Sequence, residues 1–226
     1  MSVMEKAIGW LAPPLCVGCG AEGMAVCLNC SASISKFGER CWRCNRLSPG
    51  CRACDVCRRT GSPSSVFIFT NYEGLSRRLL AAYKFGHLRT ASADISKMMA
   101  MTIGEYSTTL DDYLIVPIPT ATSRMRQRGF GHAELLAKQL AWQLRLERRE
   151  ILRRLGQTRQ LGASREVRLR QLKDNFSVRR PAAVKGRKVL LVDDVLTTGG
   201  TVIAAAQAIR AAGAAGVDAL LFAKRL

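Results

Sequence analysis

The stretch VLLVDDVLTTGGT, residues 189–201, decides the fold of this chain. In it an apolar run ends in two adjacent carboxylates, Asp193 and Asp194, and small hydroxyl and glycine residues follow at once. An apolar run without polar alternation indicates a strand that is buried on both faces, which is typical of a parallel sheet. The helical pattern TVIAAAQAIRAAG begins at Thr201, so the loop after this strand is expected to lead directly into a helix.

Strand and helix patterns alternate through the chain on either side of this stretch. Strands are predicted at residues 66–72, 113–119, 188–192 and 217–223, and helices at 73–85, 91–103, 132–144 and 201–213. This alternation predicts an α/β fold with an open, mainly parallel sheet and helices on both faces. Leu136, Leu140 and Leu144 form the apolar stripe of one helix, and Trp142 is expected to pack with it.

The loop that follows the acidic pair has the residue types that bind an anionic phosphate: Thr197, Thr198, Gly199, Gly200 and Thr201. Glycine lets backbone N–H groups point inward, and a helix N-terminus favours negative charge. Carboxylates would repel a bare phosphate, but they can accept hydrogen bonds from vicinal hydroxyls of the same ligand. The combination therefore predicts a ribose 5-phosphate group, whereas the motifs of P-loop ATPases and dinucleotide-binding folds are both absent from the sequence.

All nine cysteines precede residue 58, and eight of them form C-x-x-C pairs: Cys16/Cys19, Cys27/Cys30, Cys41/Cys44 and Cys54/Cys57. Two such pairs supply one tetrahedral site, so four pairs predict two structural zinc ions. Disulfides and a thioredoxin-like redox pair fit less well, and an iron–sulfur cluster is a further alternative. We expect the first four cysteines to bind one ion and the last four the other, although interleaved pairing would also satisfy the spacing. Cys51 lies close enough to Cys54 to leave the register of the second site open.

Residues 58–65, RRTGSPSS, have the composition of a linker. They divide the chain into an expected double zinc-ribbon domain at residues 1–60 and an α/β domain at residues 61–226. The N-terminal sequence lacks the layout of a secretory signal peptide, and no apolar run is long enough to span a membrane. We therefore expect a cytoplasmic protein. His87 and His132, the only histidines, are expected at the surface.

The net charge of +18 is concentrated in one segment, because residues 124–188 carry 19 basic and 5 acidic side chains. A surplus of this kind is typical of proteins that bind nucleic acid or a phosphorylated ligand, although a solvated basic surface is the alternative. Arg124, Arg126 and Arg128 recur at every second position and would share one side of an extended loop, with Phe130 as a stacking surface. This pattern predicts binding of single-stranded DNA.

The stretch at residues 189–201 closely resembles the signature of type I phosphoribosyltransferases that binds phosphoribosyl pyrophosphate (PRPP). Three further segments and the cysteine pairs extend the similarity: YKFGHLR (83–89), VPIPTATSRMRQRGFGHAELLA (116–137) and TRQLGASREVRLRQLKDNFSV (158–178). Together they resemble the ComF family of competence-associated proteins, which includes GntX-like members. The resemblance implies a small N-terminal double zinc ribbon fused to a sheet domain of the type I phosphoribosyltransferase kind.

The resemblance also implies roles for individual residues. Asp193 and Asp194 would hold the ribose hydroxyls of PRPP, and residues 197–201 would hold its 5-phosphate, with Mg²⁺ accompanying the ligand. Lys84 is similar to the pyrophosphate-loop position, and Arg124, Arg126 and Arg128 fall in the family's RxRGF segment, so these four would act in catalysis. Gly131 and His132 stand where many members have Asn-Gln or Asn-His, so no role in binding a base is transferred there.

The function that the resemblance implies is cytoplasmic handling of single-stranded DNA during natural transformation. PRPP and single-stranded DNA would be its partners, and proteins of DNA uptake or recombination are candidate partners. The alternatives are an active phosphoribosyltransferase, of the glycosyltransferase class, that transfers ribose 5-phosphate to a base in nucleotide metabolism, and a regulatory module that only binds PRPP. The sequence leaves open whether catalysis persists and which base would accept the sugar.

Overall fold

A four-stranded parallel sheet forms the centre of the protein. The computed structural model describes residues 13–58, 61–86, 88–106, 110, 112–120, 125, 129–155 and 176–225. The sheet contains β1 (Val66–Asn71), β2 (Tyr113–Pro117), β5 (Lys188–Leu196) and β6 (Gly216–Lys224). The strands lie in the order β1-β6-β5-β2, and every neighbouring pair is parallel. This arrangement confirms the predicted open, mainly parallel α/β sheet.

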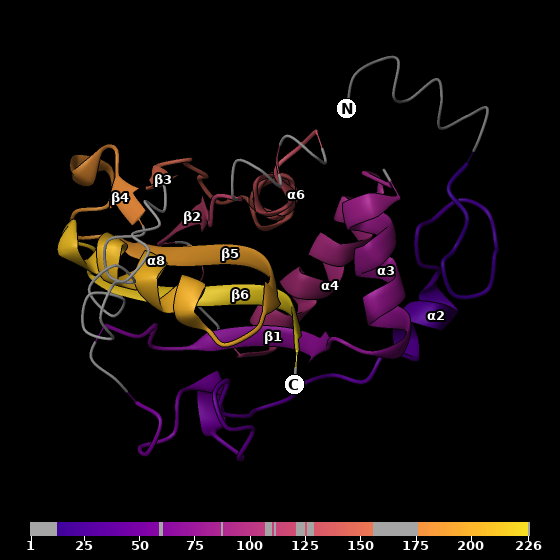
Figure 1. The fold of residues 1–226 in the computed structure, drawn as a ribbon, viewed down its shortest axis with the longest axis horizontal. Coiled ribbons are helices and arrows are strands. Elements are labelled where there is room, and N and C mark those ends of the chain that lie inside the picture. The colour runs from indigo at the N-terminus through magenta and orange to yellow at the C-terminus, as the bar shows by residue number, and fades with distance from the viewer. Residues whose placement is uncertain are drawn as a thin grey trace, which may run out of the picture.

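Helices cover both faces of this sheet (Figure 1). They are α3 (Gly74–Phe85), α4 (Ala91–Tyr106), α6 (His132–Leu144) and α8 (Gly200–Ala211). Side chains of β5 alternate between the two layers, because Leu190 and Val192 pack with α3, α4 and α6, whereas Val189 and Leu191 pack with α8. All four of these β5 residues are fully buried, as the unbroken apolar run predicted.

A second, two-stranded sheet has no counterpart among the predicted elements. It pairs β3 (Leu152–Arg154) with β4 (Phe176–Val178) in antiparallel register, and the short helical turn η2 (Pro181–Ala183) follows. Each strand has only three residues, so neither shows a readable periodicity. The buried ring of Phe176 anchors this sheet to the core layer that contains α8.

The cysteine-rich segment contains little regular structure, only α2 (Leu28–Ala32) and the turn η1 (Pro49–Cys51) among its described residues. Its first part lies beside α3 and α4, where the carboxylate of Asp94 accepts hydrogen bonds from the N–H groups of Ala25 and Val26 at 2.9 and 3.3 Å. Its second part runs on past the edge strand β1 (Figure 1), and the N–H group of Phe37 donates to the carbonyl of Phe69 at 2.8 Å. The segment therefore packs against the sheet domain in two separate places.

Two expectations about the core were wrong. Trp142 is 79% exposed, because it lies two residues beyond Leu140, about 200° around the helix from the buried stripe. His132 is 1% exposed, and its ring meets the edge of the Tyr83 ring at 5.1 Å between centroids. The start of α6 is thus turned inward. His87 lies outside the described residues.

No helix among the described residues combines the length and the apolar character that crossing a lipid bilayer requires.

Candidate functional site

The acidic pair lies at the carboxyl end of β5, which continues beyond its predicted end at Val192 to Leu196. Register with β6 pairs Asp193 with Leu221 and, at the strand end, Leu196 with Lys224. The carboxylate of Asp193 accepts a hydrogen bond from the N–H group of Asp194 at 2.9 Å. The sheet itself therefore holds the pair in place, at the edge where open α/β sheets bind their ligands.

Lys84, at the end of α3, is brought to the same place. Its Nζ lies 2.6 Å from Oδ1 of Asp194, and the two side chains are only 15% and 14% exposed. Partial burial strengthens an ion pair, because less water lies between the charges to screen them. Packing of α3 beside the sheet thus joins two residues that are 110 positions apart in the sequence.

Asp193 has an unusual proton affinity for a carboxyl group. Burial raises its pKa to about 8, and the neighbouring Asp194 carboxylate adds to the rise, while the Asp194 N–H group and the Lys84 charge oppose it. The ionised form is therefore disfavoured until a ligand supplies hydroxyl donors or positive charge. A carboxyl group perturbed in this way, at the ligand-binding edge of a sheet, is typical of a functional site.

The loop at residues 197–201 joins β5 to α8 and presents the start of that helix. Gly199 has a φ of 80°, in the left-handed region that favours glycine, and α8 begins at the next residue. Within the described residues no side chain caps the first turn, and the first N–H groups of a helix have no partner within the helix itself. Thr197 and Thr198 are exposed beside them. The geometry suits a bound phosphate.

Two residues that the sequence analysis did not single out also belong to this region. Glu134 lies in the first turn of α6, burial raises its pKa, and its charge further disfavours ionisation of Asp193. The guanidinium of Arg89 lies 4.8 Å from the centre of the Phe130 ring, which also packs on Tyr83. Both residues lie in segments that carry the family resemblance, 83–89 and 116–137, but within these segments each has the appearance of an ordinary polar side chain until the fold is known.

The predicted catalytic arginines Arg124, Arg126 and Arg128 lie outside the described residues. Gly129 and Phe130, which follow them directly, are described and border Arg89. At the start of the following helix α6, the carboxylate of Glu134 accepts a hydrogen bond from the N–H group of Thr120, just beyond the carboxyl end of β2, at 3.4 Å. The described neighbours of this arginine segment therefore approach the same end of the sheet.

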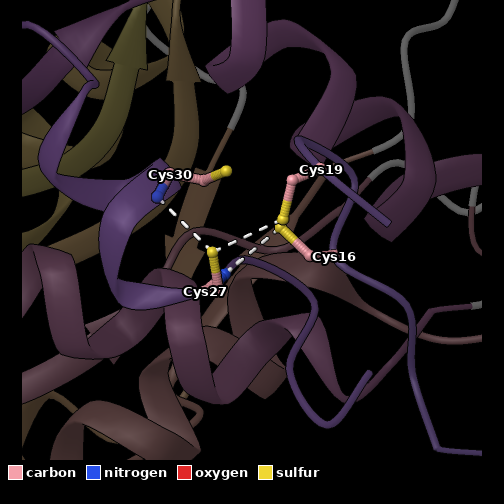
Figure 2. Close-up of side chains that lie close together, drawn as sticks. All are labelled: Cys16, Cys19, Cys27 and Cys30. Atoms are coloured by element: carbon pink, nitrogen blue, oxygen red, sulfur yellow. Dashed lines mark hydrogen bonds between the residues drawn. The ribbon is translucent and has the colours of Figure 1, made fainter. Parts of the chain in front are cut away.

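Eight cysteines gather into two groups of four, and within each group all sulfur atoms lie within 4.8 Å of one another. The groups are Cys16, Cys19, Cys27 and Cys30, and Cys41, Cys44, Cys54 and Cys57. Figure 2 shows the first group, in which the sulfurs face a common space. Four thiol groups at this spacing match the tetrahedral donor set of structural zinc, so the two clusters fit a double zinc ribbon.

Backbone hydrogen bonds favour the thiolate form at one cysteine of each group. Burial acts to raise the pKa of Cys16, but N–H donors from Cys27 and its other neighbours outweigh it and lower the pKa to about 6. Cys41 has the same arrangement, with N–H donors from Cys44 and Cys54, and its pKa is also lowered to about 6. Thiolates are the form of cysteine that binds metal.

Cys51 lies outside both groups. It is 1% exposed, and burial together with the charge of Glu39 raises its pKa to about 12. Its backbone φ of 56° belongs to the turn η1, which turns its side chain into the core. The open register of the second cluster is thereby resolved: Cys54 and Cys57 join it, and Cys51 packs as an apolar side chain.

Several known proteins are similar to this chain in sequence or in structure. Residues 127–226 match the model of the phosphoribosyl transferase domain. Competence protein F of Haemophilus influenzae is 26% identical over 210 residues, which cover 88% of this chain and 85% of that protein. DNA utilization protein YhgH of Escherichia coli O6:H1 is 26% identical over 221 residues, 95% and 91% of the two chains. The structure of an adenine phosphoribosyltransferase matches 65% of this chain and 75% of its own, at 20% identity and a TM-score of 0.39.

Replacing Asp193 with asparagine is expected to stabilise the ligand-free protein increasingly as the pH rises. In the folded protein the pKa of Asp193 is about 8, which is above its value in the unfolded chain. The wild-type carboxyl group therefore contributes fully to the free energy of unfolding below about pH 4, and this contribution is lost as the pH rises toward 8. Thermal unfolding should show the variant more stable by roughly 1–3 kcal/mol near pH 9 and by little near pH 4. Asp55→Asn, whose side chain is 93% exposed, is the control. A stability difference that is the same at both pH values contradicts the assignment.

Metal analysis of the purified protein is expected to find about two zinc ions per chain. Cys16→Ser should release about one ion, because a cluster of three thiolates binds zinc far more weakly. Cys51→Ser makes the same chemical change at another buried cysteine and should retain both ions. Protein that was never exposed to a chelator and yet contains no metal would disprove the zinc assignment.

Proposed function

Because the chain belongs to the ComF family of competence-associated proteins and carries a phosphoribosyltransferase domain, we propose that it binds PRPP at the carboxyl end of β5. The observation that carries this proposal is the acidic pair Asp193–Asp194 beside the uncapped N-terminus of α8. The carboxylates would accept hydrogen bonds from the ribose hydroxyls, and the helix N-terminus would hold the 5-phosphate. One ligand would thus bridge both features.

Lys84 has the charge that the pyrophosphate of this ligand requires. Its ammonium group pairs with Asp194 at 2.6 Å in the structure. An arriving pyrophosphate offers a stronger, multiply charged partner, so Lys84 would turn toward it and leave Asp194 free to accept a ribose hydroxyl. Mg²⁺, arriving with PRPP, would neutralise the remaining negative charge of the pyrophosphate.

An active transferase is the second candidate, and the position of Lys84 favours it. In that reaction the bond from C1 of the ribose to pyrophosphate breaks, a bond from C1 to a ring nitrogen of the acceptor forms, and pyrophosphate leaves. Lys84 would stabilise the negative charge that develops on the leaving group. Release of pyrophosphate from PRPP only when a base is present separates the enzyme from a protein that simply binds PRPP.

For the biological role, we propose that the protein handles single-stranded DNA in the cytoplasm during natural transformation. The relatives named as competence and DNA utilization proteins support this role. Among the described residues of the basic segment, Arg153, Arg179 and Arg180 lie at and beside the β3–β4 sheet. Arg148 and Arg149, in contrast, are paired with Glu150 and Glu147. The cations at the β3–β4 sheet are the ones that phosphates of a strand would contact first.

PRPP affinity is expected to fall at least tenfold in the double variant Asp193→Asn/Asp194→Asn, measured by calorimetry in the presence of Mg²⁺. Each charge-assisted hydrogen bond to a hydroxyl contributes about 1.5–3 kcal/mol, and asparagine weakens it. Asp112→Asn removes an exposed carboxylate away from both cysteine clusters and should leave the affinity unchanged. Circular dichroism checks that the double variant is folded. Equal affinity of the folded double variant and the wild type would show that the acidic pair does not bind the ribose.

Affinity for single-stranded DNA is expected to fall steeply as salt rises, because each neutralised phosphate adds roughly −0.7 to the slope of log affinity against log salt. Alanine at Arg124, Arg126 and Arg128 should flatten the slope by about two units if all three contact phosphates. Alanine at Arg153, Arg179 and Arg180 tests the β3–β4 surface in the same way, and alanine at the ion-paired Arg148 and Arg149 is the control. Equal slopes for both triple variants and the wild type would locate the DNA elsewhere.

A further inference from the structure

One side chain connects the second cysteine cluster (Cys41, Cys44, Cys54 and Cys57) with the loop at residues 197–201, here called the phosphate loop. Trp42 follows the cluster residue Cys41 and is 1% exposed. Its ring packs against Gly199 so closely that a Cβ atom on this glycine would lie 2.6 Å from Cζ3 of the tryptophan. The same core layer includes Leu196 and Val202, which flank the loop on either side. The buried Trp42 ring thus supports the phosphate loop by packing against its backbone at Gly199.

A second contact joins the second cysteine cluster to the strands beside the phosphate loop. Lys224, which is 4% exposed at the end of β6, is the register partner of Leu196, the last residue of β5 before the loop. Its ammonium group donates a hydrogen bond to Oδ1 of Asn45 and lies 5.4 Å from the centre of the Phe37 ring. Asn45 directly follows Cys44, and its N–H group donates to the carbonyl of Cys41 at 2.9 Å. The C-x-x-C turn from Cys41 to Cys44, here called the knuckle of the second cluster, is therefore bonded to the strand ends beside the loop.

The first cluster makes different contacts. A Cβ atom on Gly18 would lie 3.4 Å from the Leu75 side chain of α3, and the N–H groups of Ala25 and Val26 bond to Asp94 of α4. In the described residues, none of these contacts involves the loop at residues 197–201. The two clusters are alike in chemistry, but their contacts with the sheet domain differ, and it is the second one that packs against the phosphate loop.

From this contact we propose that Trp42 is a positioning residue for the phosphate loop and that occupancy of the second cysteine cluster is coupled to PRPP binding. The inference rests on the proposed function of the loop. Gly199 has a φ of 80° and no side chain of its own, so it depends on a neighbour to hold its conformation. Metal bound by Cys41, Cys44, Cys54 and Cys57 fixes the knuckle, the knuckle fixes the Trp42 ring, and the ring fixes Gly199.

Coupling of this kind is reciprocal, because binding free energies at two linked sites change each other by the same factor. Release of the loop frees one or two backbone residues, whose reordering on binding weakens affinity by roughly tenfold or more. PRPP should in turn strengthen metal binding by the second cluster alone. A purely structural zinc site, unconnected to the loop, would show neither effect.

The first test compares a matched pair of exposed cysteines, one in each cluster, by zinc content and by calorimetry with PRPP. Cys44→Ser should lose about one ion and bind PRPP roughly tenfold more weakly, whereas Cys19→Ser should lose about one ion with a much smaller change. Trp42→Ala should weaken PRPP binding while retaining more zinc than Cys44→Ser, and Trp142→Ala, at an exposed tryptophan, is its control.

The second test uses the wild type and therefore does not depend on whether a variant folds. Zinc release to an excess of chelator is followed with and without PRPP. Slower release of one of the two ions supports the coupling, and equal rates, or equal slowing of both ions, overturn it. If the wild type binds no PRPP, the proposed function itself fails. If it does bind, and Cys44→Ser and Trp42→Ala bind equally well, only the coupling is disproved.

Discussion

Two adjacent carboxylates at the end of a central strand repel each other, and much of the structure around β5 serves to hold them together. Asp194 pairs with Lys84 from α3, while burial and the neighbouring Asp194 charge raise the pKa of Asp193 to about 8 and disfavour its ionised form. Neither arrangement would persist in open solvent, where water would screen the charges. The layers of helices on both faces of the sheet supply the burial that makes the pair responsive to a ligand.

The cysteine-rich segment has a similar relation to the site. Its first part is bonded to α4 and packs on α3, the helix that carries Lys84, and its second part packs under the loop that contains Gly199. Its buried apolar side chains pack into the core layers of the sheet domain and it contains little regular structure, so a segment of this length depends on bound metal for a stable shape. Among the described residues, the two clusters of four cysteines thus pack against different parts of the sheet domain, and it is the second whose neighbour Trp42 contacts the loop that contains Gly199.

Most of the regular elements were predictable because their patterns are local. The unbroken apolar runs marked the buried strands, and repeats of apolar residues every three or four positions marked the helices. The β3–β4 sheet was missed because its strands are three residues long and lie far apart in the sequence. Trp142 and His132 were misplaced because residue type was given more weight than position on the helix: His132 lies four positions before Leu136, on the leucine stripe of α6, whereas Trp142 lies opposite that stripe.

By itself, the sequence determined the α/β class, the two sets of cysteine pairs and the acidic strand end followed by a loop of glycine and threonine, since each depends on spacing within a few residues. Only the tertiary structure decided that Lys84 pairs with Asp194, that Glu134 approaches Asp193, that Cys51 stays outside the clusters, and that Trp42 lies against Gly199. These contacts join residues far apart in the chain. They are set by how helices and cysteine knuckles pack on the sheet, which no local pattern encodes.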